Sequence, residues 1–185
     1  MAGRLITGLK SWFGARLRDR KGVAVVEFAF ILPLLITLYF GVVETTYAVM
    51  ADRRVAAVTS TVADLVAQTK TVNQDELDDI FRAATAIMVP FESTDLSIVV
   101  TSVVIDEEGN ATVDWSAAAP GSGQAYGTGA SFDIPEGLRI PDTSLIVAEV
   151  GYLYNSFLNH VVSSGIPMSD IFYLRPRASD KVNIF

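Results

Sequence analysis

A single carboxylate stands inside the longest apolar run of this chain. Glu27 is the only charged residue between Val23 and Val43, a stretch of 21 residues. A charge in apolar surroundings costs free energy unless a countercharge lies beside it. We therefore expect Glu27 to have a charged partner or a specific function. The rest of the chain offers few groups with obvious chemistry.

No complete catalytic constellation accompanies this carboxylate. The only histidine, His160, is close in sequence to Ser163 and Ser164, but a Ser-His-Asp device depends on three groups that the fold must bring together. The chain contains no cysteine, and no HExxH, Walker or dinucleotide-binding pattern occurs in it. We therefore predict no catalytic residue and no cofactor.

The acids Asp75, Asp78 and Asp79 suggest a metal site at first sight. They follow Asn73, which is a good helix N-cap, and Glu76 occupies the capping-box position. Carboxylates favour the positive end of the helix dipole, so a capped and solvated helix start explains these acids better than a metal ion does. No metal ligand is predicted.

The run from Val23 to Val43 is long enough to span a membrane. As a helix it would measure roughly 31 Å at about 1.5 Å per residue, against a hydrocarbon core of roughly 30 Å. Fourteen of its residues are Val, Ile, Leu or Phe. These favour insertion by about 4 to 8 kcal/mol, whereas a mid-membrane charge costs about 2.5 to 3.5 kcal/mol on the same scale. Insertion therefore tolerates Glu27 without explaining it.

Charge is distributed unevenly on the two sides of this run. Residues 1–22 carry six basic residues and one acid, and the rest of the chain carries eight basic residues and twenty acids. The positive-inside rule places residues 1–22 in the cytoplasm, with Arg16, Arg18, Arg20 and Lys21 beside the span. The acidic remainder lies outside and argues against a nucleic-acid partner. A cleaved secretory signal is the alternative, but the run exceeds the roughly 7 to 15 apolar residues of such signals.

The junction of leader and span resembles the processing site of type IV pilin precursors. A basic leader ends in Gly22, an apolar helix follows, and Glu27 stands fifth after the glycine with the aromatic Phe28 behind it. The resemblance implies that a membrane-embedded prepilin peptidase cuts between Gly22 and Val23. The new α-amine at Val23 would lie one helical turn from Glu27, which could neutralise it or the N-terminus of a neighbouring subunit. Pairing with a neighbour would set the register between subunits.

Within the pilin superfamily, the chain is most similar to the TadE-like (TadE/TadG) minor pilins, or pseudopilins, of the tight-adherence (Flp) pilus. The leader and helix carry the main part of this similarity. "IVAEVGYLYNSF" (residues 146–157) and "FYLRPRASDKV" (residues 172–182) carry a less specific part. Phe28 departs from the tyrosine that is common in tight-adherence pilins, and the outer part is far larger than in their short major pilin.

This similarity implies a non-enzymatic minor subunit of the bacterial inner membrane that is used in assembly of the pilus. Its partners would be the membrane, the prepilin peptidase, other pilin subunits and the pilus assembly machinery. The alternative is an uncleaved single-pass membrane protein whose periplasmic domain binds a ligand or an envelope partner. Cleavage of the chain before Val23 would distinguish the two.

The sequence predicts an α+β fold of the type IV pilin kind, with a long N-terminal membrane-spanning helix packed on a small antiparallel sheet. The predicted segments are a leader (1–22), a transmembrane helix (23–47) and a periplasmic domain (48–185), into which the helix continues to about residue 70. The apolar stripe of this continuation is Val55, Val58, Val62, Leu65 and Thr69. The core face of a second helix, capped by Asn73, is Leu77, Ile80, Phe81, Ala84 and Met88.

A β pattern follows Pro90. Residues 96–105 and 111–116 flank the turn sequence "DEEGN" and predict a hairpin. A long Gly- and Pro-rich loop over 117–144 packs on the domain or contacts a partner. Residues 145–155 predict a central strand with Ile146, Ala148, Val150, Tyr152 and Tyr154 on one face.

Residues 171–177 predict a last strand that is ended by Pro176. Arg175 and Arg177 stand on either side of this proline, and each guanidinium could clamp a carboxylate. The carboxylate could belong to a partner subunit or to the domain itself. We favour the pair within the domain.

Overall fold

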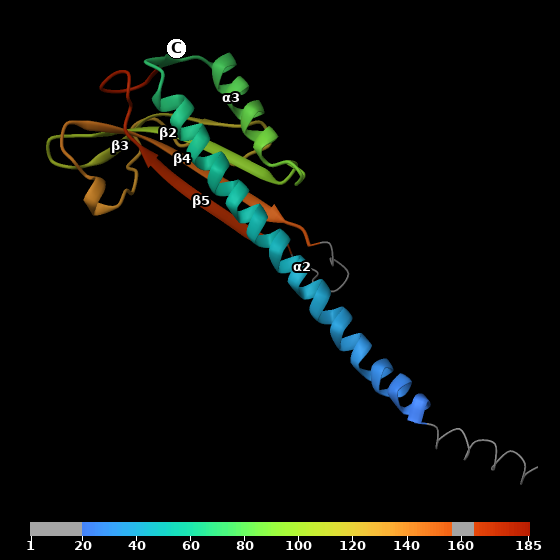
Figure 1. Ribbon diagram of the computed structural model, residues 1–185. Coiled ribbons are helices and arrows are strands. Elements are labelled where there is room, and N and C mark those ends of the chain that lie inside the picture. Colours follow the sequence, from blue (N-terminus) through green and yellow to red (C-terminus); the bar gives the residue numbers. More distant parts are fainter. Residues whose placement is uncertain (1–19, 157–164) are drawn as a thin grey trace, which may run out of the picture. The chain divides into compact units, whose positions relative to one another are not determined.

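The computed structural model describes residues 20–156 and 165–185 (Figure 1). The chain divides into two compact units, residues 1–46 and residues 47–185. The helices are α2 (Arg20–Ala67), α3 (Gln74–Ile87) and the short 3-10 helix η1 (Glu136–Leu138). The strands are β1 (Thr71–Val72), β2 (Leu96–Ile105), β3 (Ala111–Ala118), β4 (Thr143–Tyr154), β5 (Ile166–Leu174) and β6 (Asn183–Ile184).

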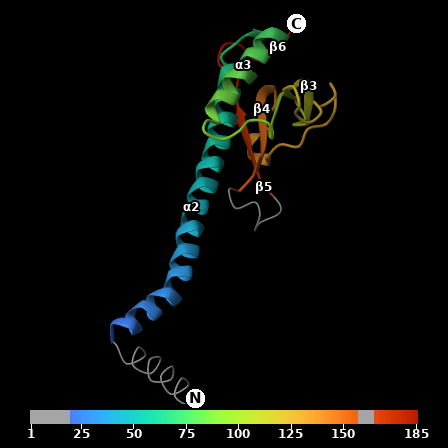
Figure 2. The same ribbon diagram turned by 90° about the vertical axis from the view of Figure 1, so that its right-hand side faces the viewer.

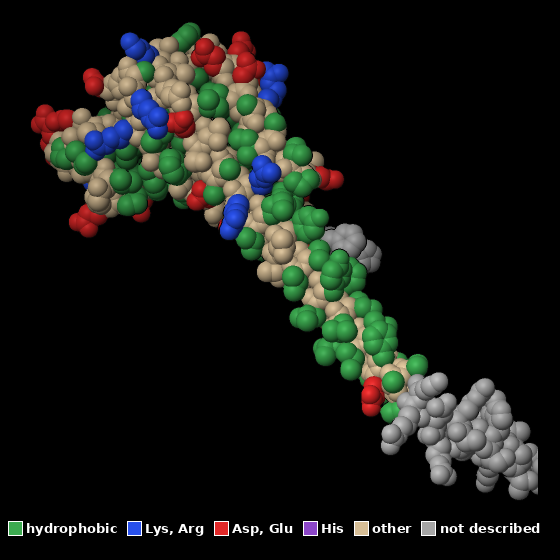
Figure 3. Space-filling view, viewed as in Figure 1, with side chains coloured by type: hydrophobic (Ala, Val, Ile, Leu, Met, Phe, Trp, Pro, Cys, Tyr) green, Lys and Arg blue, Asp and Glu red, His purple; other side chains and the backbone are tan. Residues whose placement is uncertain are grey.

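In the first unit, α2 is apolar on all sides and none of its membrane-compatible window is buried in the protein. Figure 3 shows green apolar side chains along this part of the helix. Pro33 lies inside the helix, and the Thr37 hydroxyl donates to the Pro33 carbonyl at 2.9 Å. By length and composition, α2 is long and apolar enough to cross a membrane.

In the second unit, the C-terminal part of α2 presents a buried stripe to the domain core. Val55, Val58 and Val62 are buried as the sequence predicted. Leu65 is only partly buried, and the stripe continues instead through Val66, which is fully buried. The helix ends at Ala67, so Thr69 is not part of it. After Val62, the buried face therefore differs from the predicted stripe by one residue. Small residues occupy much of this face, and the type of a small residue does not show whether it is buried.

Helix α3 begins with the predicted capping box. The Asn73 side chain accepts a hydrogen bond from the Glu76 N–H at 2.8 Å, and the Glu76 carboxylate accepts one from the Asn73 N–H at 3.1 Å. Leu77, Phe81 and Ala84 are the buried residues of the helix. The capping box therefore fixes the start of a helix whose apolar face closes the domain core.

Replacement of Asn73 by Ala should destabilise the second unit by about 1 kcal/mol, because the Glu76 N–H loses its acceptor at the helix start. The measurement is the free energy of unfolding from hydrogen exchange of the sheet amides. Asn73→Ser keeps an acceptor at the same position and is the control, with an expected loss of only a few tenths of a kcal/mol. Equal stability of the Ala and Ser variants would contradict the capping assignment.

Four strands form one antiparallel sheet in the order β3-β2-β4-β5. The predicted hairpin is confirmed: β2 and β3 flank residues 106–110, where Gly109 has a φ of +84° that suits glycine. The central position of β4 is also confirmed. The five residues predicted for its buried face are all buried.

The two faces of the sheet are covered differently. Helices α2 and α3 lie over one face, as Figure 2 shows, and their apolar residues pack with those of β2, β3 and β4 in the main core. A smaller core on the other face contains Phe132 and Ile134 from the long connection between β3 and β4. The predicted α+β fold class, with a long helix packed on an antiparallel sheet, is therefore confirmed.

The C-terminal segment differs from the predicted one. The strand predicted over residues 171–177 begins earlier, at Ile166, and ends at Leu174. It is an edge strand, where Pro167 is tolerated because its missing N–H need not pair. It is not the last strand, since β6 follows and pairs in parallel with β1. Two-residue strands carry no periodicity, so their pairing across the chain was not predicted.

Candidate functional site

The predicted processing segment lies in the first described turns of α2. The described part of this helix runs from Arg20, and Gly22, Val23, Glu27 and Phe28 all have helical backbone. All four residues are exposed. None of the described residues buries this segment.

Glu27 stands four residues after Val23 in this helix, so the two side chains share one helix face. In the described part of the chain no hydrogen bond or ion pair to Glu27 is found. The carboxylate is therefore available to a positive charge that comes from outside the described residues or from a second subunit. This geometry suits the charge pairing predicted from the sequence.

The predicted leader residues lie at the limit of what the structure describes. Arg16 and Arg18 lie outside the described residues. Arg20 and Lys21 have helical backbone in α2, and the structure does not describe their side chains. Their assignment as topology determinants rests on sequence charge alone.

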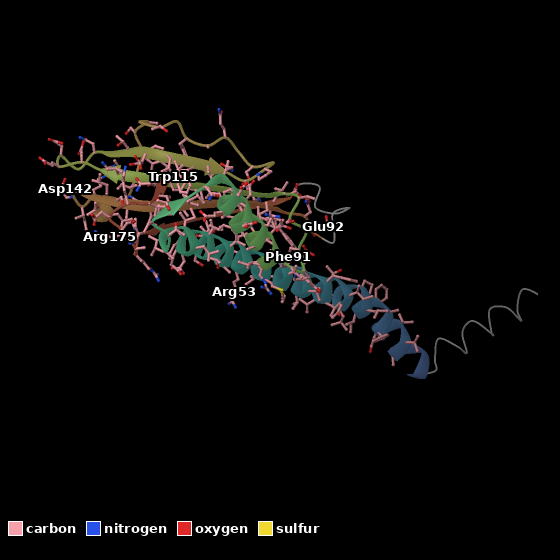
Figure 4. All side chains as sticks on the ribbon, turned by 90° about the horizontal axis from the view of Figure 1, so that it is seen from above. Arg53, Phe91, Glu92, Trp115, Asp142 and Arg175 are labelled. Atoms are coloured by element: carbon pink, nitrogen blue, oxygen red, sulfur yellow. The ribbon has the colours of Figure 1, made fainter. Side chains whose placement is uncertain are left out.

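The two arginines around Pro176 have different surroundings. Arg177 Nη2 lies 2.9 Å from Asp64 Oδ1 of α2, outside hydrogen-bond geometry, so the contact is an ion pair. Both side chains are partly exposed, and such pairs contribute about 0 to 1 kcal/mol. The Arg177 N–H donates to the Ala67 carbonyl at 2.8 Å and so closes the end of α2. Among the described residues no ion pair involves Arg175, which is exposed (Figure 4).

A shallow groove lies beside Arg177 in the second unit. It separates α2 from the edge strand β5. Its lining residues are Ser60, Thr61, Asp64, Leu65, Phe172, Leu174 and Arg177. The groove places β5, which is an edge strand among the described residues, beside Asp64 of α2. This arrangement is compatible with a subunit contact but specifies no ligand.

The long connection between β3 and β4 packs on the domain. Its backbone pairs with β3 through the Val113 N–H and the Ala130 carbonyl, at 2.9 Å. The Tyr126 hydroxyl lies 3.3 Å from Glu149 Oε1, and partial burial together with this carboxylate raises the pKa of Tyr126 above its ordinary value. Burial and the same carboxylate also raise the pKa of Tyr173. The phenols therefore stay protonated at neutral pH, and the connection contacts β3 and β4 through these backbone and side-chain interactions.

The structure describes only some of the residues that were considered for catalysis and metal binding. His160, Ser163 and Ser164 lie outside the described residues. Of the three acids at the start of α3, Asp78 accepts a hydrogen bond from Gln74 and Asp79 forms an ion pair with Arg82. Within residues 20–156 and 165–185, no group of three or more His, Cys, Asp or Glu side chains could hold a metal ion.

Sequence reasoning missed one cluster near the start of the second unit. The ring centroids of Tyr47 and Phe91 are 6.5 Å apart, and those of Phe91 and Tyr154 are 6.1 Å apart, both in edge-to-face geometry. These residues come from α2, from the segment after α3 and from β4. The aromatic type of each residue was the only available signal, because their proximity depends on the tertiary fold.

Comparison with known proteins supports the assignment made from the helix. Residues 22–64 match a protein-family model that is described as TadE-like protein. This match confirms the resemblance in the helix, where it begins at Gly22 and ends at Asp64, and it includes neither α3 nor the sheet. No curated protein and no solved structure matches the chain.

Proposed function

We propose, from the match of residues 22–64 to the TadE-like family, that this chain is a prepilin-like minor pilin of a tight-adherence pilus. The precursor is anchored in the membrane, cut by a prepilin peptidase between Gly22 and Val23, and used in assembly of the pilus. The observation that carries the proposal is the place of Gly22, Glu27 and Phe28 in the first turns of a single apolar helix. The role is structural and needs no catalytic group.

Charge supports a defined orientation for the precursor. The leader is strongly basic and the second unit is acidic. The positive-inside rule then puts residues 1–22 in the cytoplasm and the α+β domain in the periplasm of a bacterial inner membrane. The Gly22–Val23 bond lies at the cytoplasmic end of the span in this orientation, where a membrane peptidase can reach it.

The exposed apolar part of α2 supports the proposal that the subunit occupies two environments in succession, first lipid and then a filament. The large apolar side chains from Val23 to Val42 are all exposed. Moving them out of lipid into water would forfeit about 4 to 8 kcal/mol of insertion energy. Other apolar helices must therefore replace the lipid when the subunit leaves the bilayer, and a filament of packed pilin helices supplies that replacement.

Glu27 gains its function in this second environment. Lipid tolerates the carboxylate near the interface, where water and headgroups are close. A packed helix bundle excludes both, so the charge needs a partner with a defined position. The α-amine of Val23 in a neighbouring subunit is such a partner, and the pair then fixes the axial position of one subunit against the next.

Gly22→Ala should prevent removal of the leader if a prepilin peptidase recognises the glycine. The measurement is mass spectrometry of the membrane-extracted protein from a host that carries the matching peptidase, in which the wild-type chain should begin at Val23. Gly41→Ala is the matched control, because it adds the same methyl group in the same helix and that group meets no atom within 4 Å. The control should be processed normally.

Retention of the leader in the wild-type chain would overturn the processing step. It would favour the uncleaved single-pass protein, whose periplasmic domain binds a ligand or an envelope partner. Normal processing of the Gly22 variant would instead show that cleavage does not depend on this glycine. A gene for a prepilin peptidase or a secretion ATPase beside the gene of this chain would support the pilus assignment independently.

A further inference from the structure

An apolar patch lies at the end of the second unit where α2 enters it. We name this patch the α2-entry rim and define it as Tyr47, Met50, Val89 and Phe91. Val89 is 64% exposed, more than any other large apolar side chain of the described second unit except the C-terminal Phe185. Tyr47 and Met50 are 46% and 39% exposed. Both α2 and the segment after α3 therefore expose apolar side chains at this end of the unit.

Two contacts hold this segment against α2. Arg54 Nη1 of α2 donates to the Ile87 carbonyl at 3.2 Å. The Tyr47 ring packs edge-to-face on Phe91. Val89 lies between these two points of attachment along the chain, so its exposure is a property of a fixed segment. Figure 4 shows Phe91 beside α2, at the end of α3.

The place of the rim along the chain indicates what covers it. Single exposed apolar side chains are common on protein surfaces and need no explanation. Tyr47, however, is the last residue of the predicted transmembrane helix (23–47), and it follows the last residue of the apolar run, Val43, by four residues, or about 6 Å of helix. The headgroup layer on each side of a bilayer is roughly 5 to 8 Å thick. Tyrosine is enriched in this layer, where its ring is apolar and its hydroxyl is wet.

Charged residues of both signs lie around the rim. Arg53 is exposed and projects away from the domain, as Figure 4 shows, and Arg54 is occupied by the Ile87 carbonyl. Asp52 and Glu92 are both exposed at the same end of the unit. Because both signs are present, apolar contact and aromatic insertion provide the attraction to lipid, and an excess of anionic lipid is not needed.

We propose that the α2-entry rim lies in the headgroup layer of the membrane and holds the α+β domain against the lipid surface in a fixed orientation. The inference requires the membrane-anchored form of the proposed function. It does not require cleavage of the leader or incorporation into a pilus. Before assembly, the domain would then present the same side to the membrane at all times and leave the opposite end free for other subunits.

The absence of cysteine from the chain allows a direct test. Spin labels are attached to Val89→Cys, Leu34→Cys and Ile140→Cys in the full chain, which is reconstituted in phosphatidylcholine nanodiscs. Leu34 reports on the span, and Ile140 is an exposed apolar residue of the second unit that lies outside the rim. Collision rates with oxygen, which concentrates in lipid, and with a water-soluble nickel complex are measured for each label.

The label at residue 89 should show a several-fold higher ratio of oxygen to nickel collisions than the label at residue 140, with a value between those at 140 and 34. The same ratio is expected when phosphatidylglycerol replaces part of the lipid. A ratio at residue 89 equal to that at 140 would overturn the inference, because the rim would then be in water. Low collision rates with both reagents would also overturn it, since they would indicate contact with a second protein chain.

The label at residue 34 separates this inference from membrane anchoring itself. A high oxygen ratio at residue 34 together with a water-like ratio at residue 89 would remove the rim contact and leave the anchored precursor intact. A water-like ratio at residue 34 would remove the anchored state on which both proposals depend.

Discussion

Replacement of Glu27 by Gln should leave insertion and cleavage intact but prevent incorporation of the subunit into pili. Insertion should become slightly easier because a charge is removed from the span. Cleavage should continue if recognition rests mainly on Gly22. Incorporation should fail because the α-amine of the neighbouring Val23 would lack its countercharge in apolar surroundings, a loss of about 3 to 5 kcal/mol by analogy with broken buried pairs.

The measurement compares the amount of processed subunit in membranes with the amount in sheared pili. Processed Glu27→Gln protein should accumulate in the membrane fraction while its share of the pili falls. Glu44→Gln is the control, because it removes the same charge from the same helix, just beyond the other end of the apolar run Val23–Val43. Equal incorporation of the Glu27 variant and the wild type would refute the register role of this carboxylate.

Trp115→Ala should be the most destabilising single change in the α+β domain that we predict. Trp115 is 4% exposed, and its Nε1 donates to the Val182 carbonyl at 2.7 Å, which joins β3 to the C-terminal segment. Loss of the buried ring should cost about 3 to 5 kcal/mol. This corresponds to a fall in protection of the slowest-exchanging sheet amides by roughly two to three and a half powers of ten.

Trp115→Phe separates the hydrogen bond from the packing. It keeps most of the apolar volume but leaves the Val182 carbonyl without this donor, so a loss of about 1 to 3 kcal/mol is expected. Ile140→Ala, at an exposed position, should change stability by less than about 0.5 kcal/mol. Equal stability of the Phe variant and the wild type would show that the bond to Val182 contributes nothing to the attachment of the C-terminal segment.

The C-terminal segment illustrates what only the folded chain decides. After β5, it reaches the end of α2 through the Arg177 N–H and the Ala67 carbonyl. It continues to β6, where Asn183 and Ile184 pair with β1. Each contact joins residues that are more than 100 positions apart in sequence, and no local pattern encodes such a pairing.

Local features were predictable because short-range physics determines them. The Asn73 capping box depends on a spacing of three residues, the hairpin at Gly109 on a turn of five, and the buried face of β4 on simple alternation. The membrane-compatible helix depends on length and hydropathy alone. The same holds for the Gly22 and Glu27 pattern, whose spacing places Val23 and Glu27 on one helix face without reference to the rest of the fold.

The sequence by itself thus determined the apolar helix, the position of the one carboxylate within its apolar run Val23–Val43, the second helix, the main hairpin and the α+β class. The tertiary structure decided which arginine is paired, because Asp64 reaches Arg177 only when α2 lies beside the end of β5. It also decided that Tyr47, Phe91 and Val89 form one rim. Hydrophobic periodicity shows which face of an element is buried, but it does not show which distant element covers that face, because apolar burial is non-directional and many partners satisfy it equally.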